Sequence, residues 1–290
     1  MLINIRAYAK VNLYLDITGR LPDGYHSLNT VMQSVSLYDS LSVTAKEESG
    51  IRLHCDAPGV PLDDRNTAFI AAQAFYRQTG YAPAADITIK KNIPSQAGLG
   101  GGSADAAGVL YALNLLYGEP LSRDILLEMC VGIGADVPFC LLGGTRECLN
   151  KGEIMRKLPD FSSFILLAKP RSGISTKEAF MKFDSGVEVV RPDCARLSAA
   201  FERGEGGNVL RYCGNVFDQL GEIENGESIK RVMAQNGALY AGLSGSGSTY
   251  FGCFENDGDM TRCRLALQNA LPDLFLRETK TVDCGLRILE

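Results

Sequence analysis

Ile93-Pro-Ser-Gln-Ala-Gly-Leu-Gly-Gly-Gly-Ser-Ala-Asp-Ala-Ala107 is the stretch of this sequence that decides the fold. Gly98 and Gly100–Gly102 carry no Cβ, so the backbone can adopt positive φ and a bulky anion can approach its N–H groups. Apolar residues follow at helical spacing, and Ser103 is predicted to cap that helix. Because a helix N-terminus offers unpaired N–H donors and a positive dipole end, the stretch predicts a phosphate-binding turn.

The residues before the turn predict a strand. Ile87, Ile89 and Ile93 occupy alternate positions around Lys91, as in a half-buried strand. A P-loop is excluded because the sequence contains no Gly-Lys pair. A dinucleotide-binding fingerprint counted from Gly98 places a serine where its third glycine belongs. A tight strand-to-helix turn or hinge without a ligand remains the alternative.

Length and charge limit the classes of protein. The 290 residues suffice for two ordinary domains, and looser composition near Pro159 places the boundary between residues 1–158 and 159–290. Lysine and arginine number 29 against 34 acidic residues, for a net charge of −5 without a long basic run. We therefore expect a small-molecule ligand and no nucleic-acid partner.

Cysteine and histidine usage indicate the compartment. The nine cysteines form no Cys-x-x-Cys pair, and their number is odd, which favours free thiols in a reducing compartment. The two histidines, His26 and His54, are too few for a multi-histidine metal site. The sequence has no apolar window of membrane-spanning length and no basic segment leading into an apolar run. A cytoplasmic protein without a membrane partner is expected.

The first strand carries two polar candidates. Every odd position from Ile3 to Ile17 is apolar, which is the clearest strand pattern in the chain. Lys10 and Asn12 lie on the opposite face, two residues apart and pointing the same way. A lone lysine on such a face is usually solvated, so Lys10 is a functional candidate only if a partner lies near it.

Two further groups have both a structural and a functional interpretation. Tyr25 and His26 follow a Leu-Pro-Asp-Gly turn, where they either pack in a loop or stack on a base. Asp136 comes shortly before Pro138, where it either caps a helix or acts in catalysis. Its apolar neighbours indicate partial burial, and a buried carboxylate needs a partner, for which Lys10 is the candidate.

Three other segments give expectations about the chain path. The small-residue turn Gly242–Thr249 is predicted to be a hairpin tip or to approach the first glycine turn closely. Val31–Val43 is predicted to form one or two strands interrupted at Tyr38-Asp39-Ser40. The tail Leu276–Leu289 is expected to supply at most one strand.

Five motifs together resemble the GHMP small-molecule kinases. They are Ala9-Lys-Val-Asn12, Pro22-Asp-Gly-Tyr-His26, the glycine stretch, Gly134-Ala-Asp-Val-Pro-Phe139 and Leu243-Ser-Gly-Ser-Gly-Ser-Thr249. The resemblance implies an α+β fold of two domains, with an N-terminal nucleotide-binding domain and a C-terminal α/β sandwich. It places the active site between the domains and implies ATP as the phosphoryl donor.

The resemblance also assigns roles to residues. Asp136 is the expected catalytic base, with Lys10 beside it. The residues expected to hold ATP are Pro94, Ser95, Gln96, Ala97, Gly98, Leu99, Gly100, Gly101, Gly102, Ser103 and Ala104. Those expected to bind the acceptor substrate are Asn12, Tyr25, His26, Thr176 and Phe180. The motifs supply no acidic Mg²⁺ ligand, so Mg²⁺ is expected on the ATP phosphates and water, with Ser103 as an added ligand.

Within this family the chain is most similar to kinases that phosphorylate the 2-hydroxyl of a cytidine-diphosphate-linked methylerythritol, in the non-mevalonate route to isoprenoids. A kinase acting on another small alcohol, such as mevalonate or homoserine, is the nearer alternative. A nucleotide-binding regulator without catalysis is the more distant one. A monomer or weak homodimer is expected.

Overall fold

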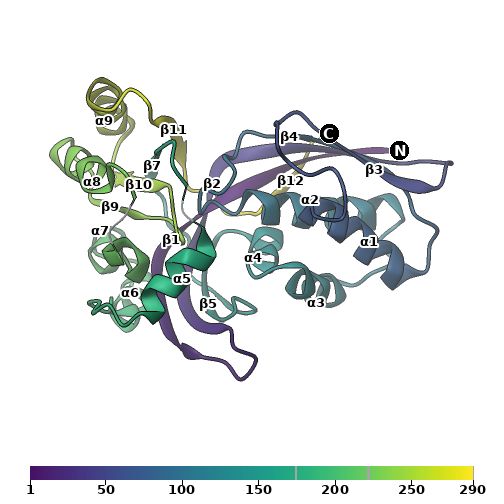
Figure 1. The fold of residues 1–290 in the computed structure, drawn as a ribbon, viewed down its shortest axis with the longest axis horizontal. Helices are drawn as coiled ribbons and strands as arrows, with labels where there is room; N and C mark the ends of the chain where they lie inside the picture. Colours follow the sequence, from purple (N-terminus) through teal and green to yellow (C-terminus); the bar gives the residue numbers. More distant parts are fainter. Residues whose placement is uncertain (174, 221–222, 290) are drawn as a thin grey trace.

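A computed structural model describes residues 1–173, 175–220 and 223–289 of the chain. Two β-sheets, each covered by helices, make up the molecule (Figure 1). The strands are β1 Leu2–Arg20, β2 His26–Ala45, β3 Gly50–Cys55, β4 Ala84–Lys90, β5 Thr145–Asn150, β6 Ile154–Lys157, β7 Phe164–Lys169, β8 Gly214–Asn215, β9 Tyr240–Leu243, β10 Tyr250–Phe254, β11 Phe275–Lys280 and β12 Leu286–Leu289. The helices are α1 Thr67–Thr79, α2 Gly101–Leu116, α3 Arg123–Ile133, α4 Val137–Leu142, α5 Thr176–Asp184, α6 Cys194–Glu202, α7 Gly206–Val209, α8 Gly226–Gln235 and α9 Asp257–Ala270, with short 3₁₀ turns η1 Leu210–Tyr212 and η2 Val216–Leu220.

The larger sheet is built on the long antiparallel pair β1 and β2, which continues as β12-β1-β2-β4-β3. Helices α1 to α4 lie on one side of this sheet (Figure 1). The odd positions of β1, such as Ile5, Ala7 and Ala9, are fully buried against these helices. The alternation in the sequence therefore gives both the strand and the face that it buries.

The even face of β1 is buried as well. Lys10 and Asn12 are 4% and 2% exposed, so the usual solvated position of a lysine on a polar strand face does not apply.

The second sheet, β11-β7-β10-β9, is covered by α8 and α9 and follows in the other half of the molecule (Figure 1). The second half packs on the end of β1, where Leu15 and Ile17 belong to its hydrophobic cluster.

Two strands from the later chain return to the larger sheet. β8 pairs with β1 in parallel, and β12 pairs with it in antiparallel register. The tail thus forms two strands, β11 and β12, and the expectation of at most one is wrong. β12 is short, and Ile288 in it is 45% exposed. Because β12 buries no continuous face, its sequence lacks the apolar alternation that predicts a half-buried strand. The boundary between residues 158 and 159 stays a prediction.

β2 is one continuous strand, so the expected interruption at Tyr38-Asp39-Ser40 is wrong. These residues pair with β1, and the register shifts between Tyr38 and Val35, which marks a β-bulge. Asp39 is fully buried, and its carboxylate accepts the N–H groups of Asn92 and Ile93. Asp39, a charged residue inside this strand, therefore binds the backbone at the start of the glycine turn.

The glycine turn lies between β4 and α2, as predicted, but the helix begins earlier than Ser103. Gly100 is the N-cap, with a φ of 72° and no side-chain capping bond, and its carbonyl accepts the first helical hydrogen bond from Ala104. Ser103 lies in the first turn of α2. Only glycine adopts this left-handed conformation at little cost, so a backbone turn replaces the expected serine cap. Over the described residues, no helix has both the length and the apolar character to cross a bilayer.

Candidate active site

Lys10 and Asp136 meet although 126 positions separate them in the sequence. Lys10 Nζ lies 3.3 Å from Asp136 Oδ2, with side-chain exposures of 5% and 34%. Asp136 stands at the N-cap of α4, but its side chain makes no capping hydrogen bond. The carboxylate is thus paired with the lysine and half-open to the cavity, and the helix-cap interpretation of its side chain is wrong.

A chain of hydrogen bonds orients Lys10. Its ammonium donates to Asn12 Oδ1 at 2.7 Å, and Asn12 Nδ2 donates to Thr30 Oγ1 at 2.8 Å. Thr30 in turn donates to the carbonyl of Tyr14 at 2.6 Å. Each polar atom in the chain has a partner on β1 or β2, so the lysine is held rigidly. Thr30 was not foreseen, because only the register of β2 against β1 places it there.

The two glycine turns touch. A Cβ at Gly98 would lie 2.1 Å from the carbonyl oxygen of Ser244, and Ser244 Oγ donates to the carbonyl of Gly98 at 2.9 Å. The predicted close approach of the second turn to the first is therefore confirmed. The first turn is also tied to β1, because Lys10 N donates to the carbonyl of Leu99 at 3.0 Å.

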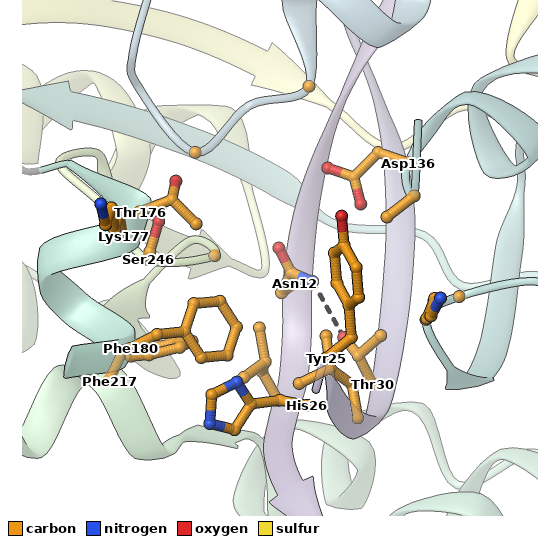
Figure 2. Close-up of a pocket in the computed structure, with 18 of the residues that line it drawn as sticks. Asn12, Tyr25, His26, Thr30, Asp136, Thr176, Lys177, Phe180, Phe217 and Ser246 are labelled. Atoms are coloured by element: carbon orange, nitrogen blue, oxygen red, sulfur yellow. Dashed lines mark hydrogen bonds between the residues drawn. The ribbon is translucent and has the colours of Figure 1, made fainter. Parts of the chain in front are cut away.

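A cavity of about 820 Å³ joins these features (Figure 2). The predicted site residues that line it are Lys10, Asn12, Tyr25, His26, Gly98, Gly100, Ser103, Asp136, Thr176 and Phe180. A second cavity of about 420 Å³ lies on the other side of the turn and is lined by all residues from Pro94 to Ser103. Ala104 is fully buried and lines neither cavity.

Aromatic side chains line the larger cavity. His26 stacks on Phe180, with ring centroids 4.6 Å apart and planes inclined by 24°. Tyr25 is 65% exposed, and its ring lies under the ammonium of Lys151 at 4.3 Å. Thr176, at the start of α5, shares a 3.0 Å hydrogen bond with Ser246 of the second glycine turn. The chain thus brings both α5 residues to the cavity.

A second buried cluster lies under the glycine turn and was not foreseen. Lys91 Nζ contacts Asp39 on β2 and lies 2.6 Å from Asp105 Oδ2 on α2. Burial raises the pKa of Asp105 to about 7 despite the lysine. Burial also disfavours the charged lysine, but the two carboxylates outweigh it and the pKa of Lys91 is raised. The available signal was a lysine inside a strand pattern, which needs a buried partner.

The described residues include no group of three or more histidine, cysteine, aspartate or glutamate side chains arranged to hold a metal ion. Ser103 lines both cavities and is the predicted ligand placed between them. This donor set fits a Mg²⁺ ion that keeps most of its coordination on phosphates and water, as Mg²⁺ usually does.

Family models match two segments of the chain. The model of the GHMP kinases N terminal domain matches residues 66–144, and that of the GHMP kinases C terminal domain matches residues 224–273. A 4-diphosphocytidyl-2-C-methyl-D-erythritol kinase from Clostridium botulinum (strain Eklund 17B / Type B) is 37% identical over 280 residues, which is 96% of this chain and 100% of that protein. The chain belongs to this family of GHMP kinases. It is therefore an ATP-dependent phosphotransferase, and the alternative of a regulator without catalysis is not retained.

Other relatives agree. The kinase of the same name from Caldicellulosiruptor saccharolyticus is 37% identical and covers 95% of this chain and 96% of its own length. A crystal structure of 4-(cytidine 5'-diphospho)-2C-methyl-D-erythritol kinase superposes with a TM-score of 0.77 at 30% identity, covering 96% of this chain and 99% of that one. The predicted α+β, two-domain GHMP kinase fold is confirmed.

More distant GHMP kinases share the architecture alone. A homoserine kinase from Cytophaga hutchinsonii has a TM-score of 0.73 at 19% identity, over 99% of this chain and 97% of that one. The L. major mevalonate kinase, solved with R-mevalonate, has a TM-score of 0.75 at 16% identity, over 96% of this chain and 95% of its own. A shared fold at such identity says nothing of which alcohol this chain accepts.

Proposed function

We propose that this kinase transfers the γ-phosphoryl group of ATP to the 2-hydroxyl of 4-diphosphocytidyl-2-C-methyl-D-erythritol, a step of the non-mevalonate route to isoprenoid precursors. One observation carries the mechanism: Lys10 and Asp136 form an ion pair at the wall of a cavity that the glycine turn and four aromatic rings also line. The names of the relatives support this choice of acceptor.

The glycine turn is the proposed cradle for the triphosphate, formed by Pro94–Ser103. Its open backbone and the start of α2 offer N–H donors and the positive end of a 16-residue helix. Mg²⁺ belongs to this proposal, on the phosphates and water with Ser103 beside it, and it would neutralise charge on the transferred group. The protein's main tasks are then to align donor and acceptor and to exclude water.

Asp136 is the proposed general base. As the oxygen of the substrate hydroxyl forms its bond to the γ-phosphorus, its proton passes to the carboxylate and the bond from phosphorus to ADP breaks. Lys10, paired with Asp136, would stabilise the negative charge that develops on the attacking oxygen. Asn12 would hold the ammonium in place, since it accepts one of its hydrogen bonds.

The cytosine end of the substrate is proposed to bind at Tyr25, His26 and Phe180. Aromatic faces suit a planar base, and the imidazole adds a polar edge. Thr176 would contact the acceptor near the second glycine turn, to which it is bonded through Ser246. This group gives a nucleotide-linked alcohol contacts that a simple alcohol does not need.

An ADP-release assay with three alcohols tests the assignment. We expect turnover with 4-diphosphocytidyl-2-C-methyl-D-erythritol and at most a trace with mevalonate or homoserine. Preferred turnover of either simple alcohol would refute the proposed acceptor and favour the alternative.

Tyr25→Ala probes the aromatic end. Stacking on a base is present in the ground and transition states alike, so KM for the cytidine-linked substrate should rise about tenfold or more with little change in kcat. Tyr81→Ala is the matched control, because Tyr81 is also partly exposed but lines a different cavity. An unchanged KM in Tyr25→Ala would remove the stacking role.

The cytoplasm is the proposed compartment. All nine cysteines are free thiols in the structure, and several are fully buried, as in proteins of reducing compartments. A monomer or weak homodimer stays a prediction, which sedimentation would decide.

A further inference from the structure

Asp184, the last residue of α5, contacts the histidine of the aromatic group. His26 Nε2 lies 2.8 Å from Asp184 Oδ1, while Arg20 Nη2 lies 2.5 Å from Oδ2 of the same carboxylate. Neither Asp184 nor Arg20 lies in one of the five motifs. The contact joins α5 to the hairpin between β1 and β2, and all three residues line the larger cavity.

The charge of Asp184 decides which nitrogen of His26 carries the proton. The hydrogen bond with His26, followed by that with Arg20, lowers the pKa of Asp184, so the carboxylate is ionised near neutral pH. An ionised carboxylate only accepts hydrogen bonds, so Nε2 must be the donor. In the neutral ring Nδ1 then has no proton and is an acceptor.

The ring is also fixed in space. It stacks on Phe180, it meets the edge of Phe183 at 6.5 Å, and its side chain is only 13% exposed. Figure 2 shows the imidazole beside Phe180 with one ring nitrogen directed into the cavity. Across the described ranges, Nδ1 of His26 has no hydrogen-bond partner in the protein.

The geometry points to Asp184 as a positioning residue for base specificity: by holding His26 as the Nε2–H tautomer, it presents a bare Nδ1 acceptor to the base of the substrate. Cytosine offers an exocyclic amino donor at this edge, whereas uracil offers a carbonyl acceptor. The pair therefore accepts a cytidine diphosphate group and rejects a uridine diphosphate group. This inference rests on the proposed function, because it takes the base to bind beside His26.

Stability alone does not account for the arrangement. Arg20 and Asp184 are 62% and 31% exposed, and exposed ion pairs contribute little to folding. His26 could pack against Phe180 without an acceptor on its far nitrogen. The carboxylate fixes the ring proton on Nε2. That choice of nitrogen affects only a group that binds to Nδ1, on the opposite side of the ring.

The ring proton can be observed in the free protein by ¹⁵N nuclear magnetic resonance. The chain has two histidines, and His54 is an internal reference, since its side chain is 60% exposed and Nε2 lies 3.6 Å from Asp86 Oδ1. A titration would find the pH at which the rings are neutral, and His54→Gln would assign the signals. We expect the neutral His26 ring to be protonated at Nε2. A ring protonated mainly at Nδ1 would overturn the inference.

Base selectivity is the second measurement, as the ratio of kcat/KM for the cytidine-linked substrate to that for its uridine-linked analogue. Asp184→Ala should lower this ratio roughly tenfold or more, because the ring is free to exchange tautomers and to rotate. Arg20→Gln is the matched control, which removes the other partner of Asp184 and should keep the ratio. An unchanged ratio in Asp184→Ala would overturn the inference.

The two failures can be told apart. Absence of turnover with the cytidine-linked substrate in the unaltered enzyme would refute the proposed function. The spectrum of the free protein needs no substrate, so it would still confirm or overturn the position of the ring proton.

Discussion

Two lysines flank the glycine turn, and their surroundings differ in one respect. Lys10 faces one carboxylate at 3.3 Å and one amide oxygen at 2.7 Å, and Asp136 remains 34% exposed to the cavity. Lys91 contacts two carboxylates, Asp39 and Asp105, whose side chains are 0% and 6% exposed. The first cluster leaves an acceptor oxygen facing open space, whereas the carboxylates of the second are almost fully buried.

This difference distinguishes a cluster suited to catalysis, that of Lys10, from one that supports the fold, that of Lys91. The proposed base needs a carboxylate oxygen that a substrate can reach, and Asp136 of the Lys10 cluster offers one. The Lys91 cluster joins β2 to the start of α2 and to the entry of the glycine turn, since Asp39 also accepts N–H groups from Asn92 and Ile93. We infer that it holds the phosphate cradle in shape, so it should matter to folding more than to turnover.

Asp136→Asn should have the largest effect. Loss of the proposed base should lower kcat about 10²- to 10⁴-fold, with a small change in the unfolding midpoint. Asp105→Asn is the matched variant in the other cluster, and its kcat should stay within about tenfold of the original. Coupled ADP release measures both variants. Equal losses in the two variants would erase the distinction between the clusters.

Lys91→Met should have the next largest effect, on stability. It leaves two buried carboxylates facing each other without a cation, which should lower the free energy of unfolding by about 3–5 kcal/mol. Lys10→Met should cost less than about 2 kcal/mol, because Asp136 is partly hydrated. Urea denaturation gives both values. A greater cost for Lys10→Met would reverse the assignment of roles.

Asp105 should give the Lys91 cluster a pH dependence. Burial raises the pKa of Asp105 from 3.8 to about 7, so the folded state holds a proton that the unfolded state releases between these values. The contribution of Asp105 to the free energy of unfolding should therefore fall as pH rises from about 4 to about 7, and stay constant above. This fall in the free energy of unfolding, a few kcal/mol at most, should be absent in Asp105→Asn.

Denaturation curves of the two proteins at several pH values measure this difference. The stability of Asp105→Asn relative to the original should grow across the window. Parallel curves would show that Asp105 is ionised throughout.

Thr30→Val should have the smallest effect. It removes the acceptor of Asn12 Nδ2, which should cost about 1–2 kcal/mol and loosen Lys10. The fall in kcat should be well below that of Asp136→Asn. Thr18→Val is a control on the same ribbon, since Thr18 is exposed and its hydroxyl donates to Ser27. Equal activity of Thr30→Val and Thr18→Val would remove the orienting role.

Much of this protein was predictable where the determinants are local. The alternation along β1 and the glycine turn between β4 and α2 depend on neighbouring residues alone. The motifs also predicted that Lys10 would lie near Asp136, which the structure confirms.

Only the tertiary structure decided the rest. The continuity of β2 through Asp39 and the return of β12 to β1 depend on partners far along the chain. The same holds for the Lys91 cluster and for the contact of Asp184 with His26, because a charged side chain shows its role only when its partner is known. Sequence patterns encode which face of a segment is buried, but the pairing of buried charges is set by how the segments come together.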